Sequence, residues 1–496
     1  MLLLGLDIGS SSVKGAVLDG NSGKVLASCF YPKKELQIHA PQAGWAEQDP
    51  ETWWSCIQEV CKELFTADGL DTSQIGAIGI SYQMHGLVVV DKDQQALRPS
   101  IIWCDSRAVE IGKQAFTSIG VGKTLVNLLN SPGNFTASKL KWVKENQPEI
   151  YDKIHKIMLP GDFIAMKLSG DIRTTVSGLS EGIFWNFKEN SLAQMLLDHY
   201  GIDASLIPET VDTFSRQGEL SSEAAELLGL KPGIPITYRA GDQPNNAMSL
   251  NVLRPGEIAA TAGTSGVVYG VSDTVRYDSQ SRVNTFAHVN HGAETRLGVL
   301  LCINGTGILN SWMKHNLASH LTYEQMNKEA EEIPIGSDGV IILPFGNGAE
   351  RVLCNENPGS QFFGIEFNRH KRAHLIRAAQ EGIVFSFKYG MDIMREMGIN
   401  PSVIRAGKAN MFLSPIFRET LAGITQTPIE LYNTDGAQGA ARAAGIGVGH
   451  YSSFEEAFEG LSLLEECNPD PEKSSAYQEA YGKWLEALKQ HSSAVE

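Results

Sequence analysis

The first hundred residues alternate short apolar runs with turn-forming residues. Such runs occur at residues 2–9, 13–19, 23–30 and 75–91, and residues such as Gly, Ser and Asp separate them. Short apolar runs between turn signals are typical of strands, and the periodicity of residues 50–67 is that of an amphipathic helix. Strands and helices that alternate in this way predict an α/β fold.

The rest of the chain carries further periodic signals. Helical periodicity prevails over residues 139–200, and residues 233–242 return to a strand that ends on an acid. Residues 453–490 have the pattern of helices with a loop at residues 468–471, and we expect this tail to be structural.

An internal repeat is visible in the sequence. Residues 4–19 have a counterpart 254 residues farther along, at residues 258–273. In both segments an apolar run leads into a glycine, then hydroxyl residues, then a second apolar run, so that Gly9 lies over Gly263. Two copies of this pattern indicate two similar domains, and chance agreement is the competing explanation.

The two copies differ in charge. The first carries Asp7 and Lys14 where the second has Thr261 and Val268. Small residues in a tight turn leave backbone N–H groups free to bind an anion, as Gly-rich loops bind phosphate. Lys14 could add positive charge and Asp7 could hold Mg²⁺ through water, whereas the alternative is a plain β-hairpin with a surface lysine. The paired turns favour nucleotide binding.

Length and one turn signal place a domain boundary. A chain of 496 residues exceeds what one hydrophobic core usually serves. Pro255-Gly256 is a turn signal just before the second copy. We therefore predict an N-terminal domain over residues 1–252 and a C-terminal domain over residues 253–496, with the candidate site in the cleft between them.

The overall charge argues against some classes of partner. The formal net charge is −16, whereas binding to nucleic acids or anionic membranes needs a basic face. The seven cysteines show no C-x-x-C spacing and are odd in number, which favours a reducing compartment. The first residues lack a basic leader, and no apolar run approaches the roughly 18 residues of a membrane span. We expect a cytoplasmic protein.

Several residues at strand ends are candidates for chemistry. Asp242 could act as a general base toward a substrate hydroxyl, although helix N-capping is a common role for Asp. Met84 and His85 close an apolar strand, where a core histidine is the more ordinary interpretation. Trp103 could pack against a sugar face or be a buried aromatic. The residues alone leave these alternatives open.

Taken together, these segments resemble the FGGY family of carbohydrate kinases. The resemblance runs in family order from about residue 3 to residue 445. It rests on the stretches LDIGSSSVK, GWAEQDPETWW, ISYQMHGLVVVD, LRPSIIWCDSRA, FTASKLKWVKENQPEI, LPGDFIAMKLSG, AGDQPNNA, TAGTSGVVY, FFGI and DGAQGAARAAG.

The resemblance implies both a fold and a reaction. The implied fold has two domains of the actin and hexokinase type, each built on a ribonuclease-H-like sheet, with ATP and sugar in the inter-domain cleft. The implied reaction transfers the γ-phosphoryl of ATP to a sugar hydroxyl, in the cytoplasm and with Mg²⁺. A pentulose is the expected sugar, with D-xylulose, giving D-xylulose 5-phosphate, as the first choice. A homodimer is left open.

The resemblance also implies roles for individual residues. Asp242 matches the family's catalytic base, and Asp7 matches the first-strand aspartate that engages the metal. The sugar is expected at Met84, His85, Trp103, Asp242 and Gln243, and ATP at Ser10, Ser11, Lys14, Gly263, Thr264, Ser265, Gly407 and Asn410.

The chain departs from the family pattern in two places that bear on the ligands. Residues 405–415, RAGKANMFLSP, stand where the family has a Gly-rich adenosine loop. Gly178 stands where many relatives have Asp, in a segment that bears on the choice of sugar. The alternatives are an FGGY kinase for L-xylulose, ribulose or gluconate, or a non-catalytic regulator that binds sugar and ATP.

Overall fold

The computed structural model describes residues 1–493 and 495. Its helices and strands divide into two units, each with a hydrophobic core of its own. The predicted boundary at residue 252 differs from this division, because residues 286–297 and 434–461 pack within the first unit. Unit 1 consists of Met1–Leu253, Phe286–Leu297 and Thr434–Leu461, and unit 2 consists of Arg254–Thr285, Gly298–Asn433 and Ser462–Glu496.

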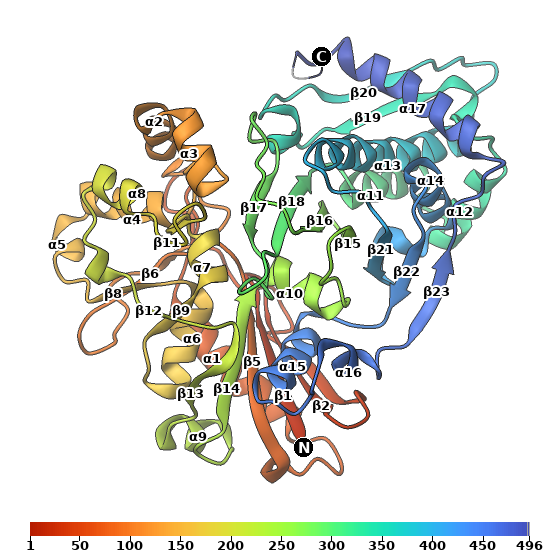
Figure 1. Ribbon diagram of the computed structural model, residues 1–496. Coiled ribbons are helices and arrows are strands. Elements are labelled where there is room, and N and C mark those ends of the chain that lie inside the picture. Colours follow the sequence, from red (N-terminus) through yellow and green to blue (C-terminus); the bar gives the residue numbers. More distant parts are fainter. Residues whose placement is uncertain (494, 496) are drawn as a thin grey trace. The chain divides into compact units, whose positions relative to one another are not determined.

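A mixed sheet forms the centre of unit 1 (Figure 1). Its strand order is β13-β14-β5-β1-β2-β3. Strands β1, β2 and β3 form an antiparallel meander. On the other side of β1, β5 runs parallel to β1, and β14 runs parallel to β5. This is the ribonuclease-H-like arrangement that the resemblance predicted. The strands are β1 (Leu2–Ile8), β2 (Val13–Asp19), β3 (Val25–Tyr31), β5 (Ile75–Tyr82), β13 (Phe214–Glu219) and β14 (Pro235–Gly241).

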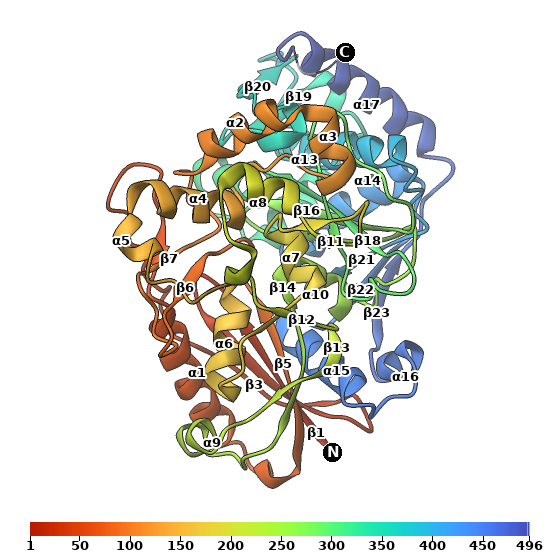
Figure 2. The same cartoon turned by 60° about the vertical axis from the view of Figure 1, so that its left-hand side comes forward.

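Helices cover both faces of this sheet. Helices α1 (Pro50–Leu64) and α6 (Pro160–Ser169) pack on one face (Figure 2). On that face Trp53 and Phe163 join Leu2, Leu4 and Leu6 of β1 in one core. Helices α10 (Asp242–Ser249) and α15 (Gly436–Gly447) pack on the other face.

The contact between α15 and the sheet explains why this late segment belongs to unit 1. The helix is rich in Ala and Gly, and it lies on β1 and β5 where those strands carry Gly5 and Gly79. A Cβ atom at Gly5 would overlap the Ala437 carbonyl oxygen, and one at Gly79 would overlap that of Ala440. Small residues on both sides therefore allow an unusually close approach of helix and sheet.

The remaining elements of unit 1 are mostly helices, with several short strand pairs. The helical signals over residues 139–200 are confirmed, since this range contains α5 to α8 and most of α4. The helices are α2 (Val109–Ile119), α3 (Val121–Leu128), α4 (Thr136–Asn146), α5 (Pro148–Tyr151), α7 (Val176–Glu181), α8 (Gln194–Tyr200), α9 (Ser222–Leu228) and α16 (Phe454–Phe458). The short strands are β4 (Glu47–Gln48), β6 (Val88–Val90), β7 (Ser100–Ile101), β8 (Lys156–Met158), β9 (Arg173–Thr175), β10 (Trp185–Asn186), β11 (Ser191–Leu192) and β12 (Glu209–Val211).

Unit 2 is built on a second mixed sheet of related topology. Its strand order is β17-β18-β16-β15-β21-β22-β23. Strand β16 runs antiparallel to β15, β21 runs parallel to β15, and β22 runs parallel to β21. The strands are β15 (Glu257–Ala262), β16 (Gly266–Ser272), β17 (Asn284–Ala287), β18 (Leu297–Ile303), β21 (Val403–Gly407), β22 (Ile429–Tyr432) and β23 (Leu463–Cys467).

The long helix α13 (Arg372–Glu396) is the central helix of unit 2. It is buried along most of its length, and Ile383 and Phe387 join Trp484 of α17 in the core. The other elements are α11 (Gly307–Leu317), α12 (Tyr323–Glu331), α14 (Pro415–Thr425), α17 (Ser474–Lys489) and the strand pair β19 (Ile341–Phe345) and β20 (Gly359–Phe363).

Residues 453–490 were expected to form helices around one loop. The expectation is correct for α16 and α17 but wrong for residues 463–467, which form β23 and pair with β22 in antiparallel register. The strand arises because the edge of β22 offers unpaired backbone groups, a tertiary influence that local periodicity does not report.

The predicted repeat is present as two hairpins. The first joins β1 to β2 through residues 9–12, and the second joins β15 to β16 through residues 263–265. The second turn is one residue shorter, so its register shifts: Asp7 pairs with Lys14, whereas Thr261 pairs with Val267.

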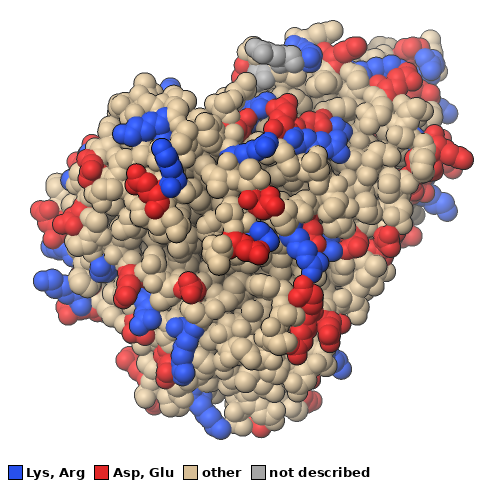
Figure 3. All heavy atoms as spheres, viewed as in Figure 1, with Lys and Arg blue, Asp and Glu red and all other residues tan. Residues whose placement is uncertain are grey.

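Acidic and basic side chains are interspersed on the face drawn in Figure 3, which has no large patch of one charge. Across the described part of the chain, no helix combines the length and apolar character needed to cross a membrane.

Candidate active site

The register of the unit 1 sheet brings two predicted acids to the same end of the sheet. Asp7 of β1 pairs with Ser81 of β5, and Ser81 pairs with Ala240 of β14. Two residues later the chain turns into α10, whose first residue is Asp242. The side chain of Asp242 does not cap the helix by a hydrogen bond, because Gly241 occupies the N-cap position. The alternative of an ordinary N-capping role is therefore not what the structure shows.

The two acids influence each other electrostatically. Burial, with a further contribution from the negative charge of Asp7, raises the pKa of Asp242 to about 7, although hydrogen bonds from Gln243 favour its charged form. Burial also raises the pKa of Asp7, and the ammonium of Lys14 opposes that rise. A carboxyl that titrates near neutral pH is suited to accept a proton from a substrate hydroxyl.

The N-terminus of α15 adds residues that the sequence reasoning did not identify. A Cβ at Gly436 would lie 2.5 Å from Oδ2 of Asp7, so the helix begins directly against this carboxylate. Asn245 of α10 holds that helix end by donating a hydrogen bond to the Gly436 carbonyl at 2.9 Å. The charge of Asp435 contributes to the raised pKa of Asp7. The motif DGAQGAARAAG was the available signal, but its place beside Asp7 depends on tertiary packing.

Asp7 suits a hydrated divalent cation rather than a closed metal cage. Among the described residues there is no group of three or more His, Cys, Asp or Glu side chains placed to hold a metal ion. Mg²⁺ commonly keeps several waters and uses only one or two carboxylates together with substrate phosphates. Asp7, at this end of the sheet, fits that donor set.

The first predicted phosphate turn is closed by its own backbone. The Gly9 N–H donates to the Ser12 carbonyl at 3.0 Å, and Gln48 donates from its side chain to the Ser10 carbonyl at 2.6 Å. Ser11 and Lys14 are exposed. The turn therefore presents hydroxyl groups and one ammonium to solvent on a fixed backbone.

The predicted sugar residues Met84 and His85 lie close to the strand end that leads to Asp242. Both follow the end of β5, and Met84 packs against Gly241, where a Cβ atom would lie 2.5 Å from the Met84 Cγ. His85 has a left-handed backbone with φ of 61°, and its Nδ1 lies 2.9 Å from the carbonyl oxygen of Glu181. Its ring packs edge-on against Phe135 at 4.8 Å between centroids. Met84 therefore lies against the residue before Asp242. His85 is linked to the same strand end through Glu181, since a Cβ at Gly241 would lie 3.0 Å from the Glu181 Oε2.

Trp103 is half exposed rather than buried. Its relative exposure is 52 %, and its Nε1 donates a hydrogen bond of 3.3 Å to the Ser10 hydroxyl. This contact connects a predicted sugar residue to the first phosphate turn. An exposed indole face beside polar groups can stack on the apolar face of a sugar.

Glu181 is a buried acid that the sequence reasoning missed. Its side chain is 2 % exposed, and neither carboxylate oxygen accepts a hydrogen bond of good geometry. Oε2 lies 3.8 Å from the Nδ1 atom of His85. Burial holds the pKa of Glu181 well above its usual range, and the nearby Asp242 raises it further. A single acid in SGLSEGIFW gives no sign of this placement.

Three of the predicted residues of unit 2 line a cavity of about 430 Å³. Gly263, Thr264 and Asn410 line it, and a Cβ at Gly263 would lie 3.7 Å from the Asn410 side-chain nitrogen. Ser265 follows Thr264 and Gly407 precedes Asn410 by three residues, but neither Ser265 nor Gly407 lines the cavity. The other lining residues are Ala262, Gly307, Ile308, Asn310, Ser311, Tyr323, Asn327, Met411, Leu413 and Ser414.

This cavity combines amide, hydroxyl and apolar groups, and no described lining residue is charged. The turn that forms its floor is fixed to the start of α11, where the Gly307 N–H donates to the Gly263 carbonyl at 2.8 Å. Its size is within the range of small-molecule and cofactor sites. Such a lining suits a neutral, flat, polar group. The residues contributed by α11 and α12 were not predicted, because they come from segments distant in sequence.

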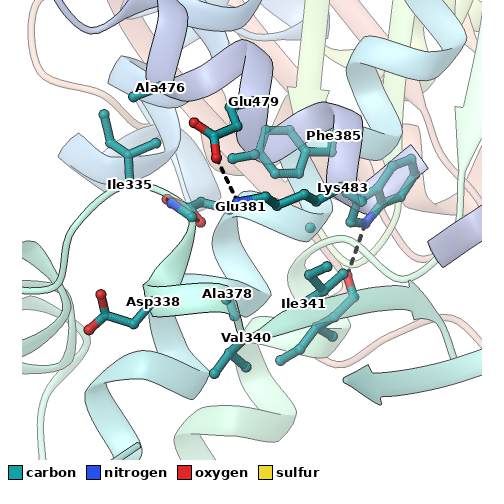
Figure 4. A pocket seen from close by; sticks show the side chains of 16 residues that line it. Ile335, Asp338, Val340, Ile341, Ala378, Glu381, Phe385, Ala476, Glu479 and Lys483 are labelled. Carbon is teal, nitrogen blue, oxygen red and sulfur yellow. Dashed lines mark hydrogen bonds and ion pairs between the residues drawn. The ribbon is translucent and has the colours of Figure 1, made fainter. Parts of the chain in front are cut away.

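A second cavity in unit 2 contains none of the predicted residues. It measures about 310 Å³ and lies between α13, α17 and residues 335–342 (Figure 4). Lys483 and Glu479 form an ion pair of 2.7 Å at its side. The carboxylate of Glu381 accepts hydrogen bonds from the backbone N–H of Gly336. These contacts are internal to the fold.

Comparisons with known proteins agree with this architecture. Residues 2–249 match the N-terminal domain of the FGGY family of carbohydrate kinases, and residues 258–448 match its C-terminal domain. The chain is 29 % identical to the xylulose kinase of Bacillus subtilis over 461 residues, covering 92 % of this chain and 90 % of that protein.

Solved structures show the same fold. The xylulose kinase from Rhodospirillum rubrum superposes with a TM-score of 0.89 at 25 % identity, covering 99 % of each chain. The Plasmodium falciparum glycerol kinase with ADP gives a TM-score of 0.88 at 21 % identity, covering 99 % of this chain and 98 % of that chain. The two matched family domains together span most of the sequence, and each contains all or most of the strands of one of the two sheets of matching topology. This chain therefore belongs to the FGGY family of carbohydrate kinases.

Proposed function

We propose that this carbohydrate kinase phosphorylates a pentulose with ATP, and that D-xylulose, giving D-xylulose 5-phosphate, is its substrate. One observation carries the proposal: Asp242, with a pKa raised to about 7, directly follows Gly241, against which Met84 packs, and it shares its end of the sheet with Asp7. A base, a sugar-binding surface and an acid suited to a hydrated cation are the parts that phosphoryl transfer requires.

In the proposed reaction, Asp242 takes the proton of a sugar hydroxyl. The hydroxyl oxygen forms a bond to the γ-phosphorus of ATP, the bond between that phosphorus and the bridging oxygen breaks, and ADP leaves. Lys14 and the turn that holds Ser10 and Ser11 are proposed to bind phosphate oxygens. Mg²⁺, held through water by Asp7, would supply charge neutralisation for the phosphates.

The adenosine of ATP is proposed to occupy the uncharged cavity of unit 2. The amide of Asn410 and the backbone of Gly263 and Thr264 line this cavity, and Gly407 ends the strand that leads to it. The relative from Plasmodium falciparum, whose structure contains ADP, supports a nucleotide as the co-substrate.

Two observations support a ketose as the sugar. The relatives from Bacillus subtilis and Rhodospirillum rubrum are xylulose kinases, although a glycerol kinase shares the fold. The proposed sugar site also holds the carboxyl groups of Glu181 and Asp242, which can donate or accept hydrogen bonds with sugar hydroxyls. L-xylulose, ribulose and gluconate are the alternatives.

The cysteines support a reducing, cytoplasmic location. All seven are free thiols, with Cys104 and Cys354 exposed. Exposed free thiols persist in the reducing cytosol.

The test is ADP release with MgATP and a panel of D-xylulose, L-xylulose, D-ribulose, gluconate and glycerol, compared by kcat/KM. The highest kcat/KM is expected for D-xylulose, and Asp242→Asn is expected to lower kcat by about 10²-fold or more. Preference for another sugar would overturn the substrate, and near-normal turnover of Asp242→Asn would overturn the base. Tight sugar binding without phosphorylated product would instead support the non-catalytic regulator.

A further inference from the structure

Lys139 is a lysine without exposed surface. It lies on α4, and its relative exposure is 0 %. A buried ammonium loses its hydration shell, so protein groups must replace the lost water. Two backbone carbonyls do so here: Nζ donates hydrogen bonds of 2.8 Å to the His85 carbonyl and 3.0 Å to the Ile102 carbonyl.

These carbonyls belong to two separate segments of the proposed sugar site. His85 follows β5 in a left-handed conformation, with φ of 61°, which is uncommon for a residue other than glycine. Ile102 follows β7 and directly precedes Trp103. One ammonium group therefore joins the backbone that carries Met84 and His85 to the backbone that carries Trp103.

The surroundings of Lys139 contain charged groups of both signs. Asp105, Cys104 and Glu181 favour its protonated form, whereas Arg107 disfavours it. Burial is the largest influence and lowers the pKa of Lys139 to about 7. The ammonium charge is therefore gained and lost in the physiological range of pH.

We propose that Lys139 is a positioning residue that fixes the left-handed His85 backbone and the start of the Trp103 segment, and thereby sets the fit of the sugar without contacting it. This inference rests on the proposed function, because His85 and Trp103 are assigned there to the sugar. Charge-assisted hydrogen bonds are roughly twice as strong as neutral ones, so the two segments are held more firmly when Lys139 is protonated.

The first experiment compares Lys139→Met with the wild type, using D-xylulose and MgATP. Methionine keeps the length of the side chain and removes its donors. The KM for the sugar is expected to rise by about tenfold or more, while the KM for ATP stays within about twofold. A matched control is Lys141→Met on the same helix, because Lys141 is partly exposed and pairs with Glu145; its sugar KM is expected not to change. Equal rises in both KM values for Lys139→Met would overturn the proposal.

The second measurement uses pH. The ratio of the sugar KM of Lys139→Met to that of the wild type is expected to fall as pH rises from 6 to 9, because the wild-type lysine loses its charge over that range. The ratio cancels the titration of Asp242, which both proteins share. A ratio that does not depend on pH would indicate a purely structural role and would overturn the proposal.

A crystal structure of Lys139→Met without ligands separates this inference from the proposed function. His85 is expected to leave the left-handed region, or the Trp103 segment to move relative to it. Unchanged positions of both would overturn the role of Lys139 even if the enzyme phosphorylates D-xylulose. If Lys139→Met does not fold, Lys139→Gln, which keeps two donor hydrogens, replaces it in each measurement. A wild type inactive on every sugar would overturn the proposed function, and the crystal structure would still decide the role of Lys139.

Discussion

Asp7 and Asp242 share one end of the unit 1 sheet, and the charge of Asp7 helps to raise the pKa of Asp242 to about 7. Burial is the larger cause of that rise. The proposed base is therefore tuned by the neighbouring acid, and a change in one carboxyl should be measurable through the other.

The first prediction concerns the pH dependence of kcat/KM. Because Asp242 accepts a proton only when ionised, kcat/KM for the sugar should rise with pH and level off above about 7. Asp7→Asn removes one of the charges that raise this pKa. Its profile should therefore level off at lower pH, with a reduced plateau because the proposed metal partner is gone.

The measurement is kcat/KM from pH 5 to pH 9 for both proteins. Asp68→Asn is the control, since Asp68 is an exposed acid outside the site, and its profile should match the wild type. An acid limb that stays in place in Asp7→Asn would show that the two carboxyls do not interact.

The second prediction concerns stability. A carboxyl with a raised pKa binds its proton more tightly in the folded state than in the unfolded state, so its contribution to stability falls as pH rises from about 4 to about 7. Asp242→Asn removes that cost. Its free energy of unfolding at pH 7.5 should exceed that of the wild type by on the order of a few kcal/mol, and the difference should vanish near pH 4.

Urea unfolding at the two pH values tests this expectation, again with Asp68→Asn for comparison. A variant that is less stable than the wild type at pH 7.5 would contradict it. We expect Asp242→Asn to be inactive but more stable, because an ionised proton acceptor in a buried site lowers the stability of the wild type.

The sequence was sufficient for features that depend on local pattern. The hairpins that hold Asp7 and Lys14, and the position of Asp242 at a strand end, follow from apolar runs and turn residues that are close in sequence. The resemblance to the family then implied a ribonuclease-H-like sheet in each domain, which the structure confirms.

Features that depend on distant packing were not predictable in this way. Glu181 and Lys139 gain their significance from burial beside His85, and neither lies near His85 in the sequence. The place of residues 434–461 in unit 1 depends on Gly5 and Gly79, which leave space for α15. Exposure of Trp103 likewise depends on the segments around it.

The third prediction concerns the nucleotide. Asn410 lines the uncharged cavity of unit 2 and has no place in the proposed sugar site. Asn410→Ala should raise the KM for ATP by about fivefold to tenfold, the loss expected for one hydrogen-bonding group, and leave the sugar KM unchanged. Asn316→Ala on exposed α11 surface is the control and should leave both KM values unchanged. A rise in the sugar KM alone would place the nucleotide elsewhere.

The fourth prediction concerns the close contact between α15 and the sheet. A methyl group at Gly5 would overlap the Ala437 carbonyl oxygen, so Gly5→Ala must push the helix away from β1. Overpacking of this kind should lower the free energy of unfolding by about 1–3 kcal/mol. Because Gly436 at the start of the same helix contacts Asp7, kcat should fall as well.

Thermal and urea unfolding, together with kcat at saturating sugar and MgATP, test both effects of Gly5→Ala. Gly122→Ala is the matched control: Gly122 lies within α3 with open space where its Cβ would stand, so alanine should be neutral or should stabilise the protein by up to about 1 kcal/mol. If Gly5→Ala were as stable as Gly122→Ala, the sheet would accept the methyl group, and the close approach of α15 would not be what holds residues 434–461 in unit 1. If its stability fell while kcat stayed normal, the start of α15 would have no influence on Asp7.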